Sequence, residues 1–412
     1  MPRLDWNGSV LRLVPFLSLR HPMRLSLTSF ALLCTALAMP ETAASAQPAK
    51  NLPEHFAYVG TYTTGESKGI YQFRVQEGPG GPTFVSVGLA AATPNPSFLA
   101  VDPKRRVLFA VNETSDFEGR PSGAVSAFSI EAATGRLTFL NQKATNGTDP
   151  CHLALDPAGR HLVVANYSSG SVAVFRVEAD GHLGDMTSFV QHEGKSVHPQ
   201  RQQGPHAHAI NFDPTGRFVY VCDLGIDQVL AYRLDANTGK LTAAGSTPLA
   251  PGAGPRHLAF GRDGKFAYVV NELNSTVTAF ATEPGSPKLR ELQTISTLPA
   301  GFTGRSTCAE IHVHPSGAFL YASNRGHDSL AIFSVDPTRG TLQAMGHHST
   351  GGKTPRHFDF TPAGTHVISE SQDSNTMQVS AVDAKTGLLK VTGALIPTPV
   401  PICVVFVPVA AR

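Results

Sequence analysis

Histidine, arginine and glutamate recur at matching places in six of seven weakly similar segments of the chain. Imidazole groups exchange protons near neutral pH, and guanidinium groups bind anions and oxyanions through paired donors. The first polar set stands at the start of an apolar run in these segments and comprises His152, His206, His208, Arg256, His257, Glu310, His312, Arg356 and His357. Such a set predicts acid–base chemistry on an anionic or carbonyl-containing ligand.

A second polar set follows the next apolar run of each segment. It comprises Asn112, Glu113, Asn166, Tyr167, Asp223, Asn271, Glu272, Asn324, Arg325 and Glu370. If the two runs are antiparallel strands, the start of the first and the end of the second lie at the same edge of the sheet. We therefore expect both sets to surround one opening.

Individual roles within the two sets stay open on sequence grounds. A histidine such as His152 either ties strands and turns together or binds a ligand. Arg256 and Arg356 are poor core residues, because a guanidinium stays charged and needs partners. Glu272 and Glu310 either form salt bridges with these arginines or act as a general base or an orienting group.

Seven copies of one unit position these residues. Each complete copy contains an apolar run, a tight turn such as Asp213-Pro214-Thr215-Gly216, a second apolar run and two further β-like runs. A period of about 50 residues with four short strands is typical of a propeller blade, and helix-period segments are absent. The copies start at Pro96, Pro150, Pro205, Pro255, Cys308, Pro355 and Pro401.

The last copy ends after one strand, between Pro401 and Pro408, and the missing three strands stand at the front of the repeat region. The sequence therefore predicts an all-β, seven-bladed β-propeller of four-stranded antiparallel blades. Pairing of the C-terminal strand with the N-terminal strands closes the ring and removes exposed edges.

Several other motifs are expected to have no catalytic role. The Asp-Pro-x-Gly and Arg-Asp-Gly-Lys motifs are interpreted as hairpin turns rather than metal sites. His192, His198, His347 and His348 are interpreted as solvated loop histidines. The cysteines have no Cys-x-x-Cys spacing, so we expect small buried side chains, with neither a disulfide nor a zinc site, at Cys151, Cys222, Cys308 and Cys403.

One connection, from Gln191 to Gln203, is longer and more polar than its counterparts. It leads directly into Pro205 and His206, so we expect it to overhang the axial opening and to bring Arg201 and Gln202 to the site. The alternative is a mobile surface loop.

The N-terminal region has the pattern of an export signal. Met23-Arg24 precedes an apolar run, and Ala44-Ser45-Ala46 resembles a signal-peptidase site. We predict a leader over 1–46, a short linker over 47–55 and one propeller domain over 56–408, without a membrane span in the mature chain. The expected location is periplasmic or secreted, and the expected state is a monomer. The net charge of +2 makes a nucleic-acid partner improbable.

The chain resembles the seven-bladed propeller lactonases, whose best-known activity is 6-phosphogluconolactonase and which include the related carboxy-cis,cis-muconate cyclases. The resemblance covers about 56–408. It rests on the segments Tyr58-Val59-Gly60-Thr61-Tyr62-Thr63, Arg201-Gln202, Gly204-Pro205-His206-Ala207-His208, Asp223-Leu224-Gly225, Gly254-Pro255-Arg256-His257 and Asn271-Glu272. It implies opening of a small-molecule lactone by a His, Arg and Glu cluster, without a cofactor or a firmly required metal.

On this basis, we predict that His206 deprotonates the attacking water, with Glu272 orienting it or sharing that role, and that Arg256 stabilises the oxyanion. The residues predicted to bind substrate are His152, Arg201, His208, His257, Glu310 and Arg356. Export favours an unphosphorylated lactone, since a phosphorylated sugar lactone is a cytosolic metabolite.

Two alternatives remain. The chain could be a non-catalytic binding or scaffold propeller of the cell envelope. It could also be a calcium-dependent lactonase that uses Glu113, Asn166, Asn271 or Glu272 as oxygen ligands.

Overall fold

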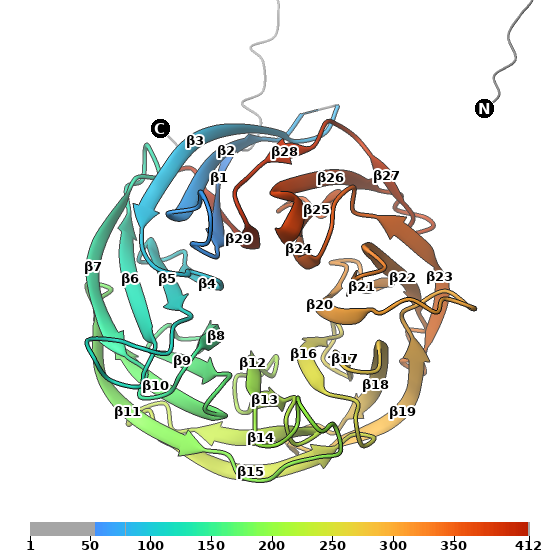
Figure 1. The fold of residues 1–412 in the computed structure, drawn as a ribbon, viewed down its shortest axis with the longest axis horizontal. Helices are drawn as coiled ribbons and strands as arrows, with labels where there is room; N and C mark the ends of the chain where they lie inside the picture. Colours follow the sequence, from blue (N-terminus) through green and yellow to red (C-terminus); the bar gives the residue numbers. More distant parts are fainter. Residues whose placement is uncertain (1–53, 79, 411–412) are drawn as a thin grey trace, which may run out of the picture. The chain divides into compact units, whose positions relative to one another are not determined.

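Seven antiparallel β-sheets form a closed ring in the computed structural model, which describes residues 54–78 and 80–410 (Figure 1). The predicted leader and nearly all of the predicted linker lie outside the described residues. Within them, the helical structure is one 3-10 turn, η1 (Gln372–Ser374). No helix in the described ranges has the length and apolar character needed to cross a membrane.

The first blade joins the two ends of the described chain. Its strands, from the axis outward, are β29 (Pro401–Pro408), β1 (Glu54–Thr61), β2 (Gly69–Gln76) and β3 (Thr83–Ala92). The antiparallel pairing of β1 with β29 confirms the predicted ring closure.

Blades two to four follow in chain order, again from the axis outward. Blade two contains β4 (Leu99–Asp102), β5 (Val107–Asn112), β6 (Ala124–Ile130) and β7 (Leu137–Ala144). Blade three contains β8 (Pro150–Leu155), β9 (His161–Asn166), β10 (Ser171–Val177) and β11 (Leu183–Gln191). Blade four contains β12 (Ala207–Phe212), β13 (Val219–Asp223), β14 (Gln228–Leu234) and β15 (Leu241–Pro248).

Blades five to seven complete the ring. Blade five contains β16 (Pro255–Phe260), β17 (Phe266–Asn271), β18 (Thr276–Thr282) and β19 (Leu289–Ser296). Blade six contains β20 (Thr307–Val313), β21 (Phe319–Arg325), β22 (Ser329–Val335) and β23 (Leu342–Ser349). Blade seven contains β24 (Pro355–Phe360), β25 (His366–Ser371), β26 (Thr376–Val382) and β27 (Leu389–Val391), with β28 (Ile396–Pro397) also paired to β26.

The hydrophobic core lies between neighbouring blades. Phe175 of blade three packs in one cluster with Phe109 of blade two, and Phe280 of blade five packs in another with Tyr220 of blade four. The second strands are buried on both faces, as in β5 and β9, which explains their continuous apolar runs. The predicted hairpin turns are confirmed, since the Asp213 carboxylate accepts the backbone N–H of Phe218.

A bulge at the start of the first strand turns one extra side chain toward the axis in several blades. In blade five, Pro255 pairs with Asn271 and His257 pairs with Val270, so Arg256 is the extra residue. The register shifts of the other blades place Cys151, His208, Arg356 and Ile402 at this bulge position.

The same registers correct one predicted repeat start. Ala207 pairs with Asp223 as Pro255 pairs with Asn271, so blade four begins at Ala207 and not at Pro205. The error arose because His206 and His208 are two residues apart, and either one satisfies the repeat pattern. His206 therefore lies one residue before β12, outside the bulge that holds His208.

Candidate active site

The axis is almost filled by side chains beneath its mouth. The cavity there has a volume of about 10 Å³, close to that of one water molecule. Its lining includes residues from the bulge positions and the positions that follow them: Ser97, Phe98, Cys151, Arg256, His257, Arg356, His357 and Ile402. This cavity has room for about one water molecule, which favours the mouth above it as the place for a larger ligand.

Besides the bulge position and the one after it, a third position in each blade contributes side chains to the mouth. It lies at the end of the second strand or directly after it, and we call it the rim position. Its backbone N–H bonds to the chain just before the first strand, as Glu272 N does to Gly254 O at 2.7 Å. Corresponding backbone bonds or strand pairing place Tyr62, Glu113, Tyr167, Leu224, Arg325 and Gln372 at this position in the other blades.

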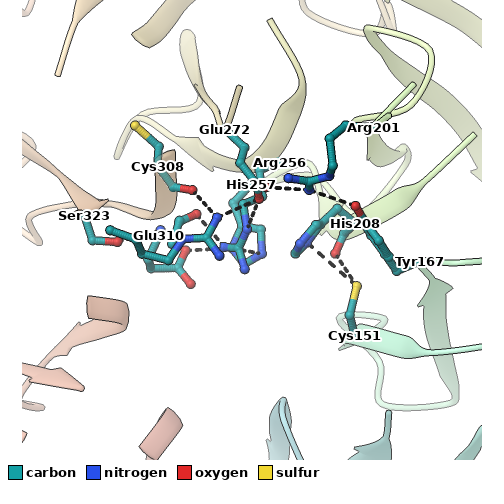
Figure 2. A network of polar contacts seen from close by, with 12 residues as sticks. Cys151, Tyr167, Arg201, His208, Arg256, His257, Glu272, Cys308, Glu310 and Ser323 are labelled. Carbon is teal, nitrogen blue, oxygen red and sulfur yellow. Dashed lines mark hydrogen bonds and ion pairs between the residues drawn. The ribbon is translucent and has the colours of Figure 1, made fainter. Parts of the chain in front are cut away.

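Glu272 is the centre of a buried ion-pair network (Figure 2). Its carboxylate lies 2.6 Å from Arg201 Nη2, 3.1 Å from Arg256 Nε and 2.8 Å from Arg325 Nη2. Burial alone would raise the pKa of Glu272, but Arg325, Arg256 and Arg201 outweigh burial and lower it to about 2. Such a weakly basic carboxylate is poorly suited to remove a proton from water at neutral pH.

Arg256 is 3% exposed, and its guanidinium is already bound to neighbouring groups. Besides its ion pair with Glu272, Nη1 donates to Ala309 O at 2.6 Å and to His257 Nε2 at 3.3 Å. Burial, followed by the charges of Arg325 and Arg356, lowers the pKa of Arg256 to about 10, so it remains charged at neutral pH.

His257 is fixed in one tautomer by two partners. Its Nδ1–H donates to Glu310 Oε1 at 2.8 Å, while its Nε2 accepts from Arg256. Burial is the main cause of the lowered pKa of His257. For Glu310, burial opposes ionisation, but His257 and then His357 lower the pKa well below its usual value. Glu310 thus pairs with histidines rather than with an arginine, which answers one question left open by the sequence.

His152 and His208 are buried beneath the mouth. His152 Nδ1 accepts the Ile210 N–H at 3.2 Å, and its ring stacks on Phe98 at 4.0 Å. His208 Nδ1 lies 3.8 Å from Cys151 Sγ. Burial lowers the pKa of both rings well below the usual range, and they sit under rather than on the rim.

His206 differs from these histidines in its exposure and its partners. Its Nδ1 lies 3.0 Å from the carbonyl oxygen of Tyr167, which can only accept, so Nδ1 carries the proton. In the neutral ring Nε2 then has the lone pair, and within the described residues it has no hydrogen-bond partner. The ring stacks on Tyr167 at 4.5 Å.

The long connection before blade four forms one wall of the mouth, as predicted. Arg201 Nη2 donates to Tyr167 Oη at 2.9 Å and to Glu272 at 2.6 Å (Figure 2). Gln202 is buried and donates to Leu224 O at 2.8 Å, which anchors the loop. Arg201, Tyr167 and His206 therefore form a continuous surface.

Asp223 positions His206 from below. One of its oxygens accepts the backbone N–H of His206 at 2.7 Å, and the other lies 2.6 Å from Nδ1 of His192. The interpretation of His192 as a solvated loop residue is therefore wrong, because it is 5% exposed and completes this support. His347 and His348 are also not loop residues: they lie in β23 and bond to Thr297 O and Ser380 Oγ.

Arg356 is the mouth arginine with the fewest interaction partners. It is half-buried, its guanidinium lies 5.2 Å from the ring centre of Tyr62, and it has no ion pair among the described residues. Tyr62 Oη donates to Glu113 at 2.8 Å. Arg356 can therefore interact with an incoming anion without losing an internal salt bridge.

The structure thus brings all nine predicted site residues to one end of the axis but sorts them by depth. It adds Tyr62, Tyr167 and Arg325, which were noted in the sequence but not selected; their shared rim position with Glu272 was the available signal.

Glu272 and His206 are not joined by a hydrogen bond within the described residues. The amide nitrogens of Asn166 and Asn271 donate to hydroxyls of their own blades. The four predicted buried cysteines are free.

Comparison with known proteins gives a consistent result. The family model described as "Lactonase, 7-bladed beta-propeller" matches residues 56–406. A 6-phosphogluconolactonase of Bacillus subtilis is 37% identical over 86% of this chain and 99% of its own. One from Formosa agariphila is 33% identical over 72% of this chain and 84% of its own. The solved structure of a periplasmic gluconolactonase from Pseudomonas aeruginosa matches with a TM-score of 0.80 and 38% identity over 87% of this chain and 100% of its own.

Proposed function

Because the chain belongs to the seven-bladed β-propeller lactonase family and is thus a carboxylic ester hydrolase, as predicted, we propose that it opens a sugar-acid lactone at the mouth of the axis. The names of two relatives, a 6-phosphogluconolactonase and a periplasmic gluconolactonase, share the gluconolactone ring, phosphorylated in the first and not in the second. Family membership also makes the non-catalytic scaffold the weaker alternative.

The observation that carries the proposal is the hydrogen bond from His206 Nδ1 to the Tyr167 carbonyl. It leaves a lone pair on Nε2 of a mouth histidine that is only partly buried. His206 Nε2 takes a proton from water, whose oxygen bonds to the lactone carbonyl carbon. The tetrahedral oxyanion then collapses, the bond to the ring oxygen breaks, and protonated His206 returns the proton to this oxygen. Water and lactone together give the hydroxy acid.

We assign oxyanion stabilisation to Arg356 in preference to Arg256. Both guanidinium groups border the small cavity. However, Arg256 is already shared between Glu272, Ala309 and His257, whereas Arg356 keeps its donors available. Arg256, Glu272 and Glu310 are positioning residues in this scheme, and Arg201 contacts the substrate hydroxyls.

We propose an unphosphorylated lactone as the preferred substrate. Arg201, Arg256 and Arg325 are each ion-paired with Glu272, which leaves Arg356 as the mouth guanidinium that has no ion pair among the described residues. One available guanidinium suits the developing oxyanion, while a phosphate would call for a second. The export pattern before residue 47 supports the same choice and a periplasmic or secreted location.

Titration of released acid at constant pH tests these points on protein lacking residues 1–46. The free gluconolactone is expected to give the higher kcat/KM, and His206→Ala is expected to lower it about 100-fold or more, as for loss of a general base. His182→Ala is the control, because His182 pairs with Asp180 on the surface. Hydrolysis by His206→Ala at the wild-type rate would refute the base assignment, and a higher kcat/KM for the phosphorylated lactone would refute the substrate preference.

Two further expectations need separate measurements. N-terminal sequencing of protein from fractionated cells tests cleavage before Gln47. Light scattering of the purified protein tests the monomer.

A further inference from the structure

A second polar cluster lies deeper on the axis than the mouth. It consists of Glu310 and His312 of β20 and His357 of β24, and we call it the axial triad. Glu310 Oε1 lies 3.9 Å from His312 Nε2, and Glu310 Oε2 lies 3.6 Å from His357 Nε2. One potential ligand atom from each residue lies within 4.8 Å of the other two.

A hydrogen bond beside the triad directs one lone pair toward its centre. His357 Nδ1 lies 3.0 Å from Glu370 Oε2, and a ring that donates there presents the lone pair of Nε2 to Glu310. His312 Nε2 is buried and has no hydrogen-bond partner among the described residues. A carboxylate oxygen and two imidazole nitrogens thus converge with no positive charge between them.

Further carboxyl groups surround this point. Asp359 follows two residues after His357 and so lies on the same side of β24, and Glu370 is fully buried behind His357. Glu370 Oε2 lies 3.0 Å from His357 Nδ1, so this carboxyl group is in direct contact with one proposed ligand. Arg256 and Arg356 border the adjoining cavity with Glu310 and His357.

We propose that Glu310, His312 and His357 bind a divalent transition-metal ion, with Zn²⁺ as the best match, and that Glu370 orients His357 through Nδ1. Two imidazoles and a carboxylate are a donor set that zinc favours, whereas calcium and magnesium favour oxygen donors. Ligands at zinc bond lengths are about 3.3 Å apart in a tetrahedron. The two histidine Nε2 atoms lie 3.9 and 3.6 Å from Glu310 Oε1 and Oε2, and the three ligand atoms lie within 4.8 Å of one another, so metal binding would draw the side chains together. Asp359 or water completes the coordination.

This site shares Glu310 with the positioning residues of the proposed lactone site, and Glu310 and His357 also line the small cavity beneath the mouth. His312 lies two residues beyond Glu310, nearer the hairpin turn of blade six, and one third of its side chain is exposed. A metal ion can therefore reach the triad without crossing the lactone mouth. The site also differs from the calcium alternative, since Glu113, Asn166, Asn271 and Glu272 take no part in it.

Metal binding to the full chain after chelator treatment and dialysis tests the proposal. Titration calorimetry with Zn²⁺ is expected to show one site per chain, and Co²⁺ is expected to give the visible absorption of a tetrahedral complex. His312→Ala should abolish both signals. Glu370→Gln should weaken Zn²⁺ binding about 10- to 100-fold, as expected for a residue that orients a ligand.

His314→Ala is the matched control, because both nitrogens of His314 are already occupied, by Ser316 Oγ and Gly364 O. It should bind Zn²⁺ like the wild type. Absence of a stoichiometric site, or equal binding by wild type, His312→Ala and Glu370→Gln, would overturn the proposal. Zinc-dependent rise of Tm in the wild type but not in His312→Ala provides a readout that does not depend on lactone hydrolysis.

Discussion

Blades five and seven carry the same Pro-Arg-His sequence at the same place and use it differently. In both, the arginine is the bulged residue and the histidine pairs with the second strand. Arg256 is bound by Glu272 at its own rim position, whereas blade seven has Gln372 there, and Arg356 lies against Tyr62 instead. The residue at the rim position thus determines whether the bulged arginine is held in an ion pair, as in blade five, or is available to a ligand, as in blade seven.

The largest expected effect is on stability, in blade five. Arg256→Ala removes one partner of a buried ion-pair network, so the free energy of unfolding should fall by about 3–5 kcal/mol. Arg356→Ala removes no ion pair and should cost about 1 kcal/mol or less. Urea denaturation of both variants measures the difference. Equal losses in the two variants would contradict the division between the two blades.

The next effect is on activity, in blade seven. Arg356→Ala should lower kcat for lactone opening about 100- to 1000-fold, as for loss of an oxyanion donor. Arg356→Lys keeps the charge but loses the paired donors, so it should recover only part of the rate. Initial rates corrected for spontaneous hydrolysis measure both. A folded Arg356→Ala enzyme with normal kcat would show that another group stabilises the oxyanion.

The third effect depends on pH and concerns Glu272. Its pKa is lowered from 4.5 to about 2 in the folded state, so the unfolded chain binds more protons between these pH values. The charged network therefore contributes about 3 kcal/mol above pH 4.5, and this contribution is lost as the pH falls toward 2. Tm measured across this range should drop more steeply in the wild type than in Glu272→Gln. Parallel curves of Tm against pH in the two proteins would contradict the lowered pKa of Glu272.

The different roles of Arg256 in blade five and Arg356 in blade seven could not be predicted from the sequence. Turn motifs and apolar runs predicted the seven blades and the ring closure, because each depends on residues close in sequence. One partner of Glu272 and one of His257 come from the next blade, with Arg325 and Glu310 each 53 residues along the chain, and these contacts depend on how the blades pack. The start of blade four was misplaced for a related reason: two histidines fitted the pattern, and only backbone pairing distinguishes them.

The smallest effect tests the rim residue directly. Gln372→Glu gives blade seven the rim carboxylate of blade five, so Arg356 should gain an ion pair and become less available to substrate. A partly exposed ion pair contributes about 1 kcal/mol, which corresponds to a roughly fivefold lower kcat/KM. The loss should shrink at high salt, since screening weakens the pair. Gln372→Ala is the control and should keep most of the activity; an equal, salt-independent loss in both variants would show that the glutamine itself matters.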